Sequence, residues 1–153
     1  MMTATNAAAS RAMLAMIGFN TVLLVGNGVF MLIAPKRWYY LVPGVKETGS
    51  FNQHFIRDIG IIQLFLGAAF GIGMVQPEHR IALWAAATLW LSAHAVFHLW
   101  EIAVGICSPS AFLRDFPAVT LPAIIGAVLT LWAIRQTRAG GAASGATLAT
   151  STP

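Results

Sequence analysis

Four long runs of apolar residues, separated by short polar segments, set the pattern of this chain. A helix that crosses a membrane needs about 20 apolar residues, because the hydrocarbon core is about 30 Å thick and each residue rises about 1.5 Å. The runs cover about residues 13–34, 51–75, 81–106 and 117–134. The pattern therefore predicts an all-α membrane protein, a bundle of four transmembrane helices in one domain that spans residues 1–139.

The residues that flank these runs predict where the helices start and stop. The first run ends at Pro35, and it is longer than the roughly 7–15 residues of a signal-peptide core, so we expect a retained span. Ser50 followed by Gln53 has the form of a capping box, which would start the second helix near Phe51. Residues 140–153 are mostly Gly, Ala, Ser and Thr, and this composition predicts a disordered C-terminal tail.

The composition supports a membrane protein and excludes several other classes. The chain is 58% hydrophobic and 9% charged, against about 25% charged residues in ordinary soluble domains. The nine Lys and Arg residues are scattered, so no basic stripe exists that could follow a nucleic-acid backbone. The single cysteine, Cys107, excludes an intramolecular disulfide and a CxxC site. Basic residues divide evenly between the two predicted membrane sides, so the orientation stays open.

Ionisable residues inside the predicted spans are the candidate functional residues. On insertion scales, each costs about 2.5–3.5 kcal/mol at the bilayer centre, so its presence needs an explanation. Three lie in the second run and three in the third: His54, Arg57, Asp58, His94, His98 and Glu101. Within each run they follow the i, i+3, i+4 and i+7 spacing of one helix face.

The expected topology would bring these two faces together. The second and third helices are antiparallel neighbours joined by a short turn at 76–80, so the start of one meets the end of the other. At about 1.5 Å of rise per residue, His54 and Glu101 each lie about 5–6 Å inside, and Asp58 and His98 about 10 Å. We therefore expect these four side chains in matched layers, with the deeper His94 beside them.

Three imidazoles and two carboxylates are ligand types for zinc, iron, manganese or copper. The leading hypothesis is a metal ion bound by these five residues: His54, Asp58, His94, His98 and Glu101. Arg57 and Asn27 would support the ligands by hydrogen bonding or ion pairing. Such a site would make the protein a redox-active, metal-dependent membrane oxidoreductase, although the sequence singles out no catalytic residue.

Three other interpretations use the same residues. A haem b could take two axial ligands from His54 and either His94 or His98. A small transporter or proton-coupled subunit could use the His, Asp and Glu side chains as a relay without a cofactor. A structural or assembly subunit could use Arg57 with Asp58 or Glu101 as an ion pair that fixes one helix against the other.

The stretch 52–60, Asn-Gln-His-Phe-Ile-Arg-Asp-Ile-Gly, together with His94, His98 and Glu101, resembles a group of small bacterial four-span membrane proteins that share an N-x-H-F-x-R-D-x-G motif. Size and hydropathy are also loosely similar to DoxX-like proteins. This second resemblance implies a four-helix membrane bundle, associated in some members with quinol-linked or redox-partner roles. We accordingly expect a multi-pass protein of the bacterial cytoplasmic membrane, with lipid as its surroundings and a homo-oligomer or a larger membrane complex as its assembly.

Overall fold

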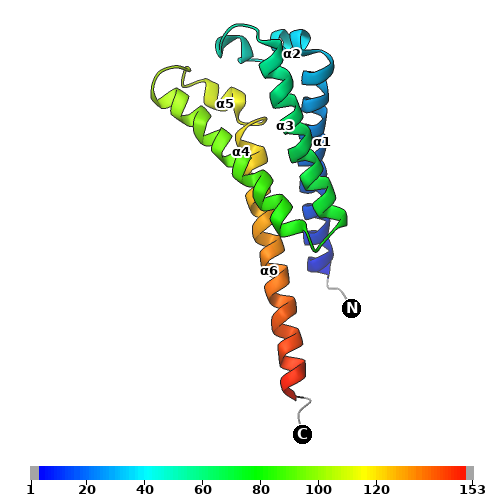
Figure 1. Cartoon of the computed structure of the whole chain (residues 1–153). Helices are drawn as coiled ribbons and strands as arrows, with labels where there is room; N and C mark the ends of the chain where they lie inside the picture. Colours follow the sequence, from blue (N-terminus) through cyan, green and yellow to red (C-terminus); the bar gives the residue numbers. More distant parts are fainter. Residues whose placement is uncertain (1–3, 151–153) are drawn as a thin grey trace.

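The computed structural model describes residues 4–150, with side chains described for residues 10–139, and regular structure within this part of the chain is entirely helical. The prediction of an all-α protein is thus confirmed. Figure 1 shows the elements in order: α1 (Ala4–Ile33), α2 (Pro35–Leu41), the 3-10 turn η1 (Val45–Glu47), α3 (Gln53–Val75), α4 (Arg80–Ala103), α5 (Ala111–Asp115) and α6 (Thr120–Thr150).

Three helices among the described residues are long and apolar enough to cross a membrane: Ser10–Ile33 within α1, and the whole of α3 and of α4. The protein therefore has the character of a membrane protein. α6 is not among the three, because its apolar run ends at Ile134 and is followed by Arg135 and Arg138. The structure thus supports three of the four predicted spans.

The helices pack as two pairs, α1 with α3 and α4 with α6. Glycines allow α1 and α3 to approach closely: a Cβ atom at Gly28 would lie 2.7 Å from the carbonyl oxygen of Gly60. At the turn between α3 and α4, Trp84 is fully buried and its indole N–H donates to the carbonyl of Phe70, 3.1 Å away. Arg80 holds the same corner, because its Nε donates to the carbonyl of Gly73 at 2.8 Å.

The pair α4–α6 is displaced along the pair α1–α3. Asn20, near the middle of the α1 span, is fully buried and its side chain donates to the carbonyl of Pro122 at 3.0 Å. Since Pro122 lies in the first turn of α6, that helix begins beside the middle of α1 and extends past the other helices at its far end (Figure 1). α5 and its connections occupy the level above the start of α6.

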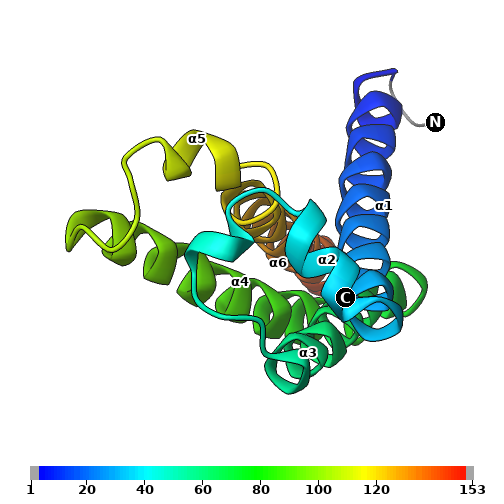
Figure 2. The same cartoon turned by 90° about the horizontal axis from the view of Figure 1, so that it is seen from above.

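Helix α4 leans away from α3 as it proceeds from the shared turn at residues 76–79, in both views (Figures 1 and 2). The connection from α1 to α3, which carries α2 and η1, crosses above α6 towards α4 and α5 (Figure 2). This divergence changes the site, because the start of α3 and the end of α4 do not form the close antiparallel contact that the sequence predicts.

Two further predictions differ from the structure. α6 continues to Thr150, whereas the composition predicts a disordered tail over 140–153; alanine, which recurs in this segment, is the strongest helix former. Residues 151–153 of that tail lie outside the described residues. The predicted capping box is wrong: Asn52, not Ser50, caps α3, and its side chain accepts from the backbone N–H of Phe55 at 3.1 Å.

We expect Asn52→Ala to lower the free energy of unfolding by about 1 kcal/mol, because the first turn of α3 loses its side-chain acceptor. Ser50→Ala is the matched control and should change stability by less than about 0.3 kcal/mol, since Ser50 is exposed and precedes the cap. Thermal unfolding in detergent, followed by circular dichroism, measures both. Equal losses in the two variants would show that Asn52 is not the cap that matters.

Candidate functional site

The structure sorts the six predicted polar residues into two separate groups. One lies on the first turns of α3 and contains His54, Arg57 and Asp58. The other lies on the C-terminal half of α4 and contains the remaining three residues, His94, His98 and Glu101. Among the interactions between described side chains, none joins a member of one group to a member of the other.

The α3 group faces outward. His54 Nε2 lies 3.2 Å from Asp58 Oδ2, one helical turn away, and the two side chains are 90% and 53% exposed. Arg57 turns instead to α1, where its Nε donates to the carbonyl of Leu32 at 3.2 Å. The predicted layers, with Asp58 opposite His98 and His54 opposite Glu101, are therefore not formed by these contacts.

The α4 group forms a line of aromatic and polar rings. His94 is half-buried and stacks on Trp90, with ring centroids 5.0 Å apart, and it meets His98 edge to face at 4.7 Å. His98 Nδ1 lies 3.6 Å from Asp115 Oδ2, and the two side chains are 22% and 19% exposed. Because Asp115 ends α5, the line connects the interior of one span to a separate element near the end of the bundle.

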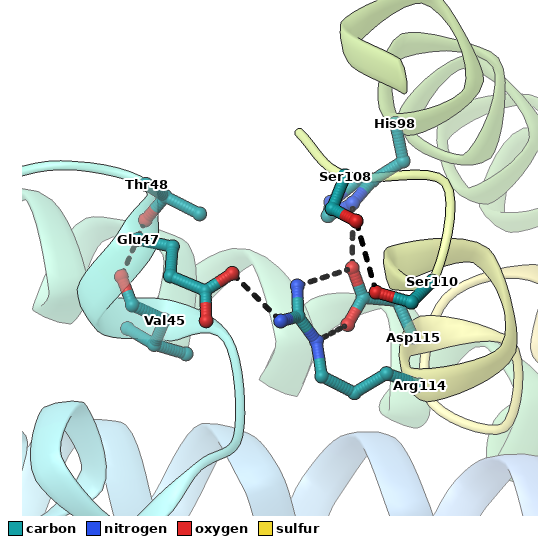
Figure 3. A network of polar contacts seen from close by, with 8 residues as sticks. All are labelled: Val45, Glu47, Thr48, His98, Ser108, Ser110, Arg114 and Asp115. Atoms are coloured by element: carbon teal, nitrogen blue, oxygen red, sulfur yellow. Dashed lines mark hydrogen bonds and ion pairs between the residues drawn. The ribbon is translucent and has the colours of Figure 1, made fainter. Parts of the chain in front are cut away.

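Arg114 joins this line to η1, in the connection between α1 and α3 (Figure 3). Its Nε donates to Asp115 Oδ1 at 2.9 Å, and its Nη1 donates to Glu47 Oε2 at 2.7 Å. These two hydrogen bonds raise the pKa of the Arg114 guanidinium above its usual range, Asp115 contributing more than Glu47. The guanidinium is therefore permanently charged, and it links η1 to α5 across the two helix pairs.

Gly44 makes this link sterically feasible. Its φ of 85° lies in the left-handed region that side chains disfavour, and a Cβ atom there would overlap the guanidinium of Arg114. Glycine therefore satisfies two requirements at once: it turns the chain into η1 and it leaves room for the guanidinium of Arg114. Thr48 closes the same turn by donating its hydroxyl to the carbonyl of Val45 at 2.7 Å.

Negative charge predominates in this region. Cys107 follows α4, and its surroundings include Glu101, Asp115 and Glu47 against the single base Arg114. Partial burial, and then the charges of Glu101 and Asp115, raise the pKa of the Cys107 thiol, so the thiol is protonated at neutral pH and a poor nucleophile. We call the set His94, His98, Glu101, Glu47, Arg114 and Asp115 the acidic cluster.

Half of the acidic cluster lies outside the predicted membrane spans and was therefore not predicted from the sequence. Glu47, Arg114 and Asp115 lie in the connections between spans, where charged residues are ordinary. The available signal was the adjacent pair Arg114–Asp115 in the connection directly after the His94 and His98 helix. Asn27 also differs from its predicted role, because its Oδ1 accepts from the indole N–H of Trp38 at 2.8 Å.

No group of three or more His, Cys, Asp or Glu side chains among the described residues has the geometry to hold a metal ion. The five predicted ligands are divided between α3 and α4, and they are in contact only within each helix: His54 with Asp58 on α3, and His94 with His98 on α4, among the described side chains. The pair that a haem b would need, His54 with a histidine of α4, shares no ring contact within the described part of the chain.

Comparisons of the chain with family models, with curated proteins and with solved structures find no match. The resemblance to DoxX-like proteins therefore stays a prediction.

Proposed function

We propose that this protein is a four-span protein of the bacterial cytoplasmic membrane that accepts and relays protons through His94, His98 and Asp115. The fourth crossing in this proposal combines the connection at 104–119, which leads inward from the end of α4, with the apolar part of α6, which starts at Thr120 beside the middle of α1. The observation that carries the proposal is the line of titratable side chains from the middle of α4 to Asp115 on α5.

The depth of the two histidines supports a relay. His98 and His94 precede the end of α4 at Ala103 by five and nine residues, which corresponds to about 7 and 14 Å along the helix axis. Ionisable side chains at such depth are a recognised element of proton pathways in membrane proteins. Imidazole suits the role because it accepts a proton on one ring nitrogen and releases one from the other.

The charges of the acidic cluster favour a proton as the bound cation. Three carboxylates and one guanidinium lie around Cys107 beside this line, so a proton on His98 reduces the net negative charge of the region. A proton received from Asp115 enters His98 at Nδ1, and the opposite ring nitrogen can pass one on towards His94 directly or through one water.

The test is proton flux in proteoliposomes that contain the full chain, an interior pH dye and an imposed potassium diffusion potential. We expect His98→Ala to reduce proton flux at least tenfold relative to the unmodified protein. His54→Ala is the matched control, since it removes an exposed imidazole of α3, and it should leave flux within twofold. Flux equal to that of empty vesicles, or equal flux in the two variants, would overturn the proposal.

Metal binding is the second candidate function, and one observation favours it. The adjacent imidazoles of His94 and His98 supply two nitrogen donors in a negatively charged setting. A third ligand would have to come from a side-chain rearrangement, because no three such side chains among the described residues are in metal-binding geometry. His54 and Asp58 lie on the outer face of α3, so this version does not use them. Stoichiometric zinc, iron, manganese or copper in purified protein, lost in the His94→Ala, His98→Ala double variant, would favour the metal over the relay.

A further inference from the structure

The three basic residues Lys36, Arg37 and Arg57, which we call the basic rim, form a second charged region independent of the acidic cluster. Lys36 and Arg37 are exposed in the first turn of α2, directly after the α1 span, and Arg57 is exposed in the second turn of α3. In the part of the chain with described side chains, none of the three is paired with a carboxylate.

The backbone places the three side chains at one end of the α1–α3 pair. Arg57 is anchored by its Nε to the carbonyl of Leu32, in the last turn of α1. Lys36 and Arg37 follow Leu32 by four and five residues, so their Cα atoms lie within about 20 Å of it even in an extended chain, and closer in the helical turn of α2. α2 also packs against α3.

Arg57 is held in a geometry suited to an anionic group. The Nε of Arg57 donates to the carbonyl of Leu32, which orients the guanidinium, while its two terminal nitrogens have no hydrogen bond to the described residues. A guanidinium can donate two parallel hydrogen bonds to phosphate oxygens, which an ammonium cannot. Lys36 and Arg37 add two further positive charges nearby.

The surroundings identify the class of ligand. Trp38, tied to Asn27, and Tyr39, whose hydroxyl donates to the carbonyl of Gly49 at 2.8 Å, lie between the span end and the connection to α3. Tyr40 and Leu41 are more than half exposed beside them. Aromatic side chains next to basic ones at the end of a span are typical of the headgroup level of a bilayer.

From this arrangement we infer that the basic rim binds the headgroup phosphate of an anionic phospholipid, with Arg57 as the residue that orients it. An unpaired cluster of three cations at the level of the headgroups is complementary to a negatively charged lipid and not to a zwitterionic one. The lipid would also cover the exposed apolar residues of α2 with its acyl chains, which a soluble phosphate could not do.

The test is native mass spectrometry of the detergent-purified full chain titrated with phosphatidylglycerol or phosphatidylcholine. The unmodified protein should prefer phosphatidylglycerol at least tenfold. The triple variant Lys36→Gln, Arg37→Gln, Arg57→Gln should lose that preference. Each charge removed should weaken binding of phosphatidylglycerol by about fivefold. Arg11→Gln, Arg135→Gln, Arg138→Gln removes the same charge from exposed residues at the opposite end of the bundle, and it should keep the preference.

The inference would be overturned if the unmodified protein showed no lipid preference, or if the two triple variants lost the preference equally. It would also be overturned if glycerol phosphate displaced the lipid at a similar concentration, because that result indicates a site for free phosphate. Arg57→Lys separates orientation from charge. It should reduce the preference by less than the triple variant, because the charge remains and the paired hydrogen bonds are lost. Far-UV circular dichroism confirms that each variant is folded.

Discussion

Gly28→Ala is expected to lower the free energy of unfolding by about 1–3 kcal/mol. The added Cβ would lie 2.7 Å from the carbonyl oxygen of Gly60 and 3.0 Å from Leu64, so α1 and α3 must separate to accept it. The neighbouring atom on α3 is backbone, which cannot rotate away. Close backbone approach at small residues is the main source of helix association in membranes, where no hydrophobic force draws helices together.

Gly26→Ala is the matched control for this prediction. Gly26 lies on the same helix, is exposed, and would place a Cβ with no atom within 4 Å. We expect a change below about 1 kcal/mol, in the stabilising direction, because alanine has the higher helix propensity. Denaturation of the purified protein in a titration of sodium dodecyl sulfate measures both. A Gly26 variant as unstable as the Gly28 variant would show that glycine acts here through α1 itself rather than through its contact with α3.

The parts of the fold that follow from local pattern could be predicted from the sequence. Apolar length gives the spans of α1, α3 and α4 within a few residues, because membrane thickness fixes the length of a helix. The fourth predicted run, 117–134, begins within a few residues of α6 (Thr120–Thr150), but the sequence pattern gives no depth for this helix relative to α1. Its position follows from the contact between Asn20 and Pro122, which are 102 residues apart, and hydropathy carries no signal for such a contact.

The candidate site shows the same division between local and long-range information. The contact of His94 with His98 follows from i, i+4 spacing and was predicted. The partner of His98 was not, because the prediction assumed that the antiparallel helices α3 and α4 stay in contact along their whole length. They diverge from their shared turn, so Asp58 pairs with His54 on its own helix, and Asp115, from a short helix in a connection, takes its predicted place beside His98.

Arg114→Gln is expected to lower the free energy of unfolding by about 2 kcal/mol. It leaves the half-buried carboxylate of Asp115 without its base and frees Glu47. The loss is smaller than the roughly 3–5 kcal/mol of a fully buried broken pair, because Arg114 is 26% and Glu47 62% exposed. Thermal unfolding measures it, and Arg138→Gln, which removes an exposed arginine of α6, should stay within about 0.5 kcal/mol of the unmodified protein.

Arg114→Lys distinguishes a bridge from a simple charge. An ammonium cannot take the place of a guanidinium that donates to Asp115 through one nitrogen and to Glu47 through another, so lysine should restore less than half of the lost stability. Full restoration would mean that only the charge matters and that the two hydrogen bonds contribute little.

Arg114→Gln should also make η1 more mobile. Glu47 belongs to η1, and its 2.7 Å contact with Arg114 is the ion pair that fastens this turn to α5. Without it, backbone amides of residues 44–48 should exchange hydrogen faster by at least tenfold, while those in the middle of α3 stay protected. Unchanged exchange at 44–48 would show that Gly44 and Thr48 hold η1 without the ion pair. Faster exchange would show that the ion pair of Arg114 with Glu47 holds η1 against α5.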